Sequence, residues 1–239
     1  LNMKDSYVNR AEVWFGAGVS PAVNIYPEGQ NRNDYSFEFV AALEKSRFIA
    51  ESGIGVNFSN EAARYRVNYT SYDSVGYYIG VTGFTLDPEN PDSIHLQTTM
   101  KSVYDSIDRF RIEETTNKYT YLQFPLRLGY RVISSDRFSV DLKMGVLFSL
   151  QVYRKVPEAP YPGSDAEQIE VIRQYPDRMK TNWQYTASVG FHYHASNHVR
   201  FSLEPFYRQY INSVYRSSSV YPARSPYGFG LRGGIYVHF

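Results

Sequence analysis

The C-terminal stretch 227–239 alternates residue by residue between two kinds of side chain, and this pattern limits the possible folds more than any other part of the chain. A period of two indicates a β-strand, because successive side chains point to opposite faces of a sheet. One face is small or polar, and the other is apolar up to the final residue. This is typical of a transmembrane β-barrel strand, which turns its apolar face to lipid. The apolar face consists of Tyr227, Phe229, Leu231, Gly233, Ile235, Val237 and Phe239.

Composition agrees with a barrel and excludes several other classes of protein. No apolar run approaches the 18 to 20 or so residues of a spanning helix, and the mean hydropathy is −0.44; barrel strands escape this test because every second residue can be polar. The 23 Tyr and 15 Phe among 239 residues suit the aromatic belts at membrane interfaces. The balance of 25 basic and 24 acidic residues argues against a nucleic-acid partner. The absence of cysteine excludes disulfides, Cys-based metal sites and a thiol nucleophile.

Eight segments show the same alternation, and each is long enough to be a barrel strand. A soluble up-and-down barrel such as a lipocalin is the alternative, but its large apolar residues would fill the inside and its outer face would be polar. Proline lacks a backbone donor, so Pro205 predicts a bulge or a bend in its strand. The predicted strands are 12–20, 35–43, 48–58, 119–132, 138–152, 182–195, 199–210 and 227–239.

The connections between these segments alternate between short and long. In an outer-membrane barrel the short turns are periplasmic and the long loops lie outside. We therefore predict an all-β, eight-stranded antiparallel transmembrane up-and-down barrel over 12–239, with a periplasmic leader at 1–11 and both barrel termini in the periplasm. No basic and apolar signal segment opens the chain, so we expect that a signal peptide has been removed or that the chain is a fragment. The short turns are 44–47, 133–137 and 196–198, and the long loops are about 21–34, 59–118, 153–181 and 211–226.

Charged residues on the polar faces of the strands are predicted to line the lumen. Eight strands enclose an interior that side chains only just fill, and buried charges must be paired because an unpaired one is costly. The sequence therefore predicts a salt-bridged plug, with a selective channel as the alternative. The predicted network consists of Glu38, Glu51, Arg127, Asp141, Lys143, Glu204 and Arg232.

Two histidines, His192 and His194, fall two residues apart on one inner face. This spacing suits two ligands of one metal, or a catalytic base with Ser188, Ser202 or Asp141 as a partner. Some outer-membrane barrels modify lipid A with a His-Ser pair or cleave peptides with Asp and His. No motif here places a nucleophile beside a base, so we predict no catalytic residue, no metal, no cofactor and no enzyme activity.

Several stretches carry a resemblance to known proteins. Residues 118–130, 138–150, 180–184 with 201–205, and 225–232 resemble the small outer-membrane β-barrel proteins of the Bacteroidetes, the group that includes PorT-like barrels. The resemblance implies the barrel fold and the outer membrane. Some relatives carry such a barrel at the C-terminus of a longer chain, after an inner-membrane helix and a cytoplasmic anti-sigma region. The chain end also resembles the signal read by the outer-membrane assembly machinery, with Ile235, Val237 and Phe239 as its residues.

The long 59–118 segment contains three Asp-Ser pairs followed by Val or Ile. This pattern resembles the O-glycosylation signal of exported Bacteroidetes proteins, which implies sugars on Ser74, Ser93 and Ser106; the alternative is that Asp-Ser pairs are ordinary turn residues. A connection of this length is functional or contains strands of its own. The Tyr-, Val- and Thr-rich runs at 64–72 and 77–84 predict hairpins above the membrane.

Three functions fit these observations. The first is a non-enzymatic barrel that anchors, or acts as an envelope-signalling or interaction module, alone or as the end of a longer anti-sigma-like protein. The second is an accessory subunit of a complex for secretion, assembly or nutrient uptake, and the third is a lipid-modifying enzyme or a small pore. The expected partners are outer-membrane lipid and lipopolysaccharide, the assembly machinery and other envelope proteins.

Overall fold

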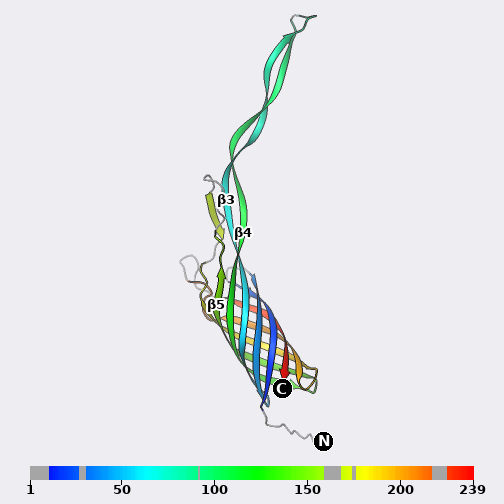
Figure 1. Ribbon diagram of the computed structural model, residues 1–239, viewed down its shortest axis with the longest axis vertical. Coiled ribbons are helices and arrows are strands. Elements are labelled where there is room, and N and C mark those ends of the chain that lie inside the picture. The colour runs from blue at the N-terminus through cyan, green and yellow to red at the C-terminus, as the bar shows by residue number, and fades with distance from the viewer. Residues whose placement is uncertain (1–10, 27–30, 91, 159–167, 174–175, 217–224) are drawn as a thin grey trace. The chain divides into compact units, whose positions relative to one another are not determined.

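A computed structural model describes residues 11–26, 31–90, 92–158, 168–173, 176–216 and 225–239 (Figure 1). No helix in the described part of the chain is long and apolar enough to cross a membrane. The predicted leader 1–11 lies outside the described residues except for Ala11. The strands are β1 (Glu12–Ile25), β2 (Asn31–Lys45), β3 (Phe48–Leu86), β4 (Ile94–Ser134), β5 (Phe138–Lys155), β6 (Gln168–Arg173), β7 (Thr181–His194), β8 (Val199–Tyr210) and β9 (Tyr227–His238).

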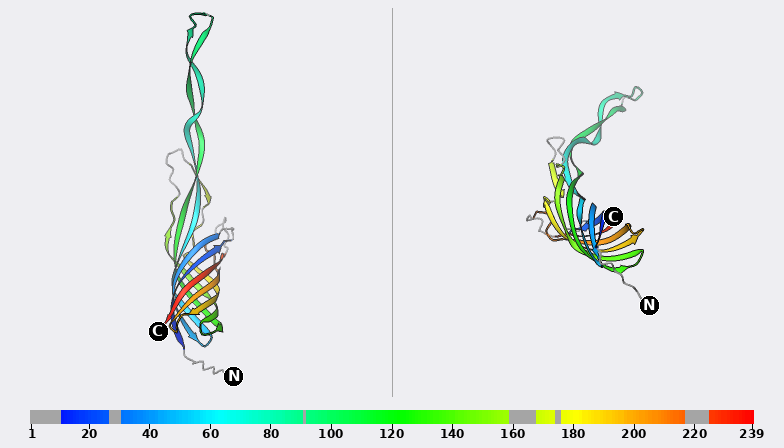
Figure 2. Two further views of the ribbon diagram at one scale, coloured as in Figure 1. Left: turned by 90° about the vertical axis from the view of Figure 1, so that its right-hand side faces the viewer. Right: turned by 60° about the horizontal axis from the view of Figure 1, so that its bottom comes forward.

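Eight of these strands form a closed ring (Figure 2). The hydrogen-bonded order is β2-β1-β9-β8-β7-β5-β4-β3, and β3 pairs again with β2. Antiparallel pairing of β1 with β9 joins the two ends of the chain. The prediction of an eight-stranded antiparallel barrel is confirmed.

The chain divides into two compact units. The first is the barrel, formed by 1–63, 116–157 and 175–239, and the second consists of 64–115 and 158–174. In the second unit β3 and β4 continue as a twisted two-stranded ribbon (Figure 1), and β6 pairs with β3 over residues 64–68. The hairpins expected at 64–72 and 77–84 are therefore one continuous ribbon, whose turn is closed by a hydrogen bond from Asp87 N to Ser93 O.

The two faces of the barrel wall are opposite in polarity. Outward side chains are apolar and exposed, such as Phe39 at 68% and Met144 at 71%. Inward side chains are polar and buried, such as Glu51 at 1% and Asp141 at 0%. A soluble barrel would have the reverse distribution, since it needs an apolar interior and a hydrated surface. The alternation read from the sequence therefore assigned the two faces correctly.

Short turns join strands at one end of the barrel. Residues 46 and 47 join β2 to β3, 135–137 join β4 to β5, and 195–198 join β7 to β8. Ser46 has a φ of 57°, a left-handed conformation that two-residue hairpin turns require. The chain end lies at this end too, because His238 N donates to His198 O.

Two prolines test the predicted ends and irregularities of strands. The long loop expected at 21–34 is wrong: Pro21 pairs with Tyr35 inside continuous strands, and only 26–30 connect β1 to β2. The strand tolerates Pro21 because β1 does not pair with β9 at Ser20 and Pro21, where the missing N–H would be needed. At Pro205 we expect a bulge or a bend, and the strand pairing shows no bulge. The β7–β8 register is the same on both sides of the gap at Glu204 and Pro205, and β9 stays paired through Pro205.

Candidate functional site

The centre of the barrel lumen holds a closed ring of six alternating charges. Its acids are Glu38, Glu51 and Glu204, and its bases are Arg127, Lys143 and Arg232, all of them buried. The ring unites six of the seven residues of the predicted network. The contacts around it are Arg127–Glu38 at 2.7 Å, Glu38–Arg232 at 2.5 Å, Arg232–Glu204 at 2.7 Å, Glu204–Lys143 at 2.7 Å, Lys143–Glu51 at 3.1 Å, and Glu51–Arg127.

The ring is formed because six of the eight strands of the wall each contribute one inward side chain. On adjacent strands Arg127 pairs with Gly145, two residues from Lys143, and Glu204 lies directly opposite Arg232. Each charge contacts two opposite charges, and the three acids balance the three bases. Such full pairing is what makes buried charges tolerable in a low-dielectric interior. The arrangement holds six paired side chains across the centre of the lumen.

Asp141, the seventh predicted residue, belongs to a second cluster nearer the short turns. Arg131 Nε lies 3.0 Å from Asp141 Oδ1, and its Nη2 lies 2.8 Å from Glu44 Oε2. Glu44 also pairs with Arg200, whose guanidinium lies 4.5 Å from the centre of the Trp14 ring. The two arginines thus balance the two carboxylates.

The two histidines have different partners. His192 Nε2 lies 3.0 Å from Asp141 Oδ2, with both side chains fully buried, whereas His194 Nε2 lies 3.2 Å from Ser139 Oγ. Ser202, one of the serines considered as a nucleophile, donates instead to Gly234 O at 3.4 Å. The Asp–His pair and the Ser–His pair therefore share no histidine. Within the described residues no three metal-ligating side chains come together.

A third cluster is centred on Glu61, at the opposite end of the lumen from the short turns. Glu61 accepts hydrogen bonds from Tyr119, at 3.2 Å, and from Tyr215. It pairs with Arg32, and Arg178 Nη2 lies 3.7 Å from it. Burial, and then the charge of Glu61, raise the pKa of Tyr215 above its ordinary value, so this hydroxyl stays protonated and can donate.

Two segments that lie outside the strands carry part of this cluster over the lumen. Arg178 and Tyr215 form an isolated antiparallel bridge, flanked by hydrogen bonds from Met179 N to Val214 O and from Arg216 N to Asp177 O. The guanidinium of Arg178 lies 4.1 Å from the centre of the Tyr119 ring. Neighbouring Arg208 pairs with Asp34 at 2.8 Å. We call this bridged pair of segments, 177–180 and 211–216, the mouth strap.

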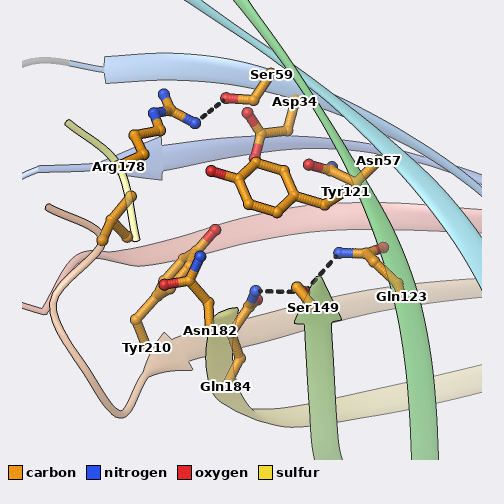
Figure 3. Close-up of a pocket in the computed structure, with 11 residues that line it drawn as sticks. Asp34, Asn57, Ser59, Tyr121, Gln123, Ser149, Arg178, Asn182, Gln184 and Tyr210 are labelled. Carbon is orange, nitrogen blue, oxygen red and sulfur yellow. Dashed lines mark hydrogen bonds between the residues drawn. The ribbon is translucent and has the colours of Figure 1, made fainter. Parts of the chain in front are cut away.

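Below the strap lies a small polar cavity of about 10 Å³ (Figure 3). Arg178 donates to Ser59 at 3.0 Å on one side of it. On the other side Ser149 accepts from Gln123 at 3.4 Å and from Gln184 at 3.3 Å. This volume is about the smallest that holds one water molecule, so the cavity is too small for an organic ligand.

The remaining predicted sites lie in the ribbon and at the chain end. Ser74 and Ser106 are exposed residues within β3 and β4, and Ser93 is half-buried beside the turn. At the chain end Ile235 is 50% exposed on the outer face and Phe239 is 90% exposed. These placements leave the serines accessible and the apolar assembly residues on the outside.

Sequence reasoning missed several lumen residues for identifiable reasons. Arg131 follows Arg127 in the period of two inside the predicted strand 119–132, so the alternation already placed it on the inner face. Glu61 follows Glu51 in the same period but lies beyond the predicted strand 48–58, so a longer strand would have included it. Arg200 alternates with the apolar Val199 and Phe201 and therefore falls on the polar face of its strand, although the predicted network does not include it. Arg178 and Tyr215 come from segments without alternation, and no sequence pattern indicates their position.

No family model matches the chain, and no curated protein sequence matches it. Solved structures with a similar strand arrangement include Neisserial surface protein A, which is 9% identical, with a match that covers 96% of this chain and 99% of that chain at a TM-score of 0.44. The outer-membrane enzyme PagL is 9% identical, and its match covers 91% of this chain and 97% of that chain at a TM-score of 0.42. The attachment invasion locus protein Ail of Yersinia pestis is 10% identical, and its match covers 95% of this chain and 99% of that chain at a TM-score of 0.37.

Proposed function

We propose that this chain is a non-enzymatic β-barrel of the bacterial outer membrane, with both barrel termini in the periplasm, that anchors the β3–β4 ribbon as an interaction module. The apolar outer wall supports insertion into a bilayer, because lipid-facing strand positions must be free of charge. The charged side chains of the ring point into the lumen and pair with one another, so they do not face the lipid. On this proposal the short turns face the periplasm, and β3 and β4 continue into the ribbon at their other ends.

The lumen supports an anchor more than a pore. The six-charge ring spans the interior with paired side chains, and the strap covers the cavity above it. Ion passage would require breaking buried pairs, and each such loss costs several kcal/mol. The separate pairing of the two histidines likewise supports a structural role, since a catalytic triad needs one histidine to contact both the nucleophile and the acid.

The exposed apolar surface of the ribbon is the observation that best supports the proposed interaction module. Large apolar side chains on it are exposed, among them Tyr72 at 72%, Phe84 at 66% and Met100 at 66%. Two-stranded ribbons are marginally stable in water alone, and contiguous exposed apolar surface marks interaction sites. A segment of this kind is costly to expose unless it meets a partner. An accessory subunit would use the same ribbon, but with one fixed partner.

The test is replacement of residues 70–108 by an Asn-Gly turn, which retains the Arg64–Glu114 pair at the base of the ribbon. The barrel should still fold, shown by its shifted mobility on unheated gels, and neither protein should give discrete conductance steps in planar bilayers. Cross-linking in native outer membranes should lose the adducts of the full chain. Discrete conductance of the intact protein, or unchanged adducts after the replacement, would overturn the proposal.

A further inference from the structure

The outer edge of β3 in the ribbon is open over a long stretch. β3 has β4 on one side, and on the other side β6 pairs with it at residues 64–68. From Tyr69 to Leu86 no described strand occupies that second side. The edge therefore accepts an added strand at its base, and beyond it no strand among the described residues pairs with that side.

This open edge has none of the usual protection against pairing. Natural edge strands carry charges, prolines or bulges that prevent pairing with another chain. Residues 74–86 contain no charged residue and no proline, and Tyr77, Ile79 and Val81 are 59% to 65% exposed. An unprotected edge of thirteen residues is a template for strand addition.

The segment is complementary to itself. If two copies pair antiparallel about Gly80, Tyr77 lies opposite Gly83, and Gly76 lies opposite Phe84. Each off-centre glycine then faces an aromatic ring, an arrangement that compensates for the missing side chain of glycine in a sheet. Ile79 lies opposite Val81, a favourable β-branched pair. The absence of charge means that identical segments do not repel each other.

We propose that residues 74–86 of β3 pair antiparallel with the same residues of a second copy of this chain, centred on Gly80. This inference rests on the proposed function, because it names the partner of the ribbon. The pairing joins two ribbons into one four-stranded sheet with two-fold symmetry. Because the same patch is used by both copies, the contact closes as a dimer.

The chain has no cysteine, so single-cysteine variants report the register directly. Gly80→Cys places two thiols opposite each other, at a Cα separation of about 4.5–5.5 Å that a disulfide can bridge. A Cβ at this position meets the Lys101 side chain at 3.6 Å, an ordinary contact. Ser74→Cys is the matched control, because its two copies would lie about 40 Å apart in this register.

After mild oxidation of native outer membranes, Gly80→Cys should give a disulfide-linked dimer and Ser74→Cys should remain monomeric. Differently tagged Ile79→Cys and Val81→Cys chains, expressed together, should cross-link to each other. Adding Val81→Lys to Gly80→Cys should abolish the dimer, because it places two charges in the edge.

Absence of the Gly80→Cys dimer in a folded barrel would overturn the self-pairing. Equal cross-linking of Ser74→Cys, or a dimer that survives Val81→Lys, would overturn it as well. If the dimer is absent but the ribbon replacement still removes adducts with other proteins, the self-pairing fails while the interaction module stands. If the replacement changes no adduct, the module itself fails.

Discussion

Removal of one carboxylate tests whether the six-charge ring holds the barrel together. Glu51 is the best position, because it contacts Arg127 and Lys143 and also accepts a hydrogen bond from Tyr236 at 3.2 Å. Glu51→Gln keeps the shape of the side chain but leaves the ring with two acids and three bases. Removing one partner from a buried pair costs about 3–5 kcal/mol. Arg127 keeps Glu38 and Lys143 keeps Glu204, so we expect a loss of about 3 kcal/mol, at the low end of that range.

The assay is reversible urea unfolding of the barrel in lipid vesicles, followed by the fluorescence of Trp14 and Trp183. A loss of about 3 kcal/mol is roughly a 150-fold change in the folding equilibrium. Asp177→Asn is the matched control, because the Arg154–Asp177 pair is 41% and 55% exposed and exposed pairs contribute at most about 1 kcal/mol.

A second variant separates the loss of charge balance from the loss of packing. Glu51→Gln combined with Lys143→Met restores two acids and two bases in the ring. We expect the double variant to be more stable than the sum of the single losses predicts, by about 1–3 kcal/mol. If Glu51→Gln costs no more than Asp177→Asn, or if the two changes are additive, the ring is not the structural unit that its geometry indicates.

Three further changes test other parts of the molecule. The pKa of Tyr215 is raised from 10.0, so the contribution of this hydroxyl to stability is complete below about pH 10 and declines at higher pH. Between about pH 9 and 11 the wild type should therefore lose more unfolding free energy than Tyr215→Phe. Equal losses in the two proteins would contradict this. A Cβ at Gly53 would clash with the backbone oxygen of Phe39, whereas one at Gly233 meets no atom within 4 Å. In the same urea assay Gly53→Ala should lower the free energy of unfolding by about 1–3 kcal/mol, and Gly233→Ala by less than about 0.5 kcal/mol. Sugars on Ser74, Ser93 and Ser106 would raise the intact mass of native material above 27.6 kDa in sugar-sized steps that a triple Ser→Ala variant removes; a native mass without such steps refutes the glycosylation.

The barrel could be predicted from the sequence because lipid imposes a rule on every strand. Alternation located all eight ring strands and placed Lys143 and Arg232 in the lumen, since a charge facing lipid would be costly. The rule applies only where there is lipid on one side and a lumen on the other. At 64–115 most side chains on both faces of the strands are exposed, so this rule gives no information there, and the sequence predicts separate hairpins where the structure has one ribbon.

The mouth strap could not be predicted for a different reason. Arg178 and Tyr215 are brought together by an isolated bridge between two irregular segments, and their common partner Glu61 lies more than a hundred residues away in the sequence. A contact of this kind depends on the closed ring being formed first. No local pattern in either segment encodes it.

The contrast between the two units supports the proposal that the ribbon is the part that interacts with other proteins. Ring closure leaves the barrel part of β3 paired on both sides, with β2 and with β4, and closure is what removes sheet edges. The same strand leaves the ring after Ala63, and beyond β6 no described strand pairs with its second side. Lipid and the pairing of lumen charges account for the side chains of the barrel part, but they do not account for the uncharged edge at 74–86. The proposed self-pairing gives that edge a function.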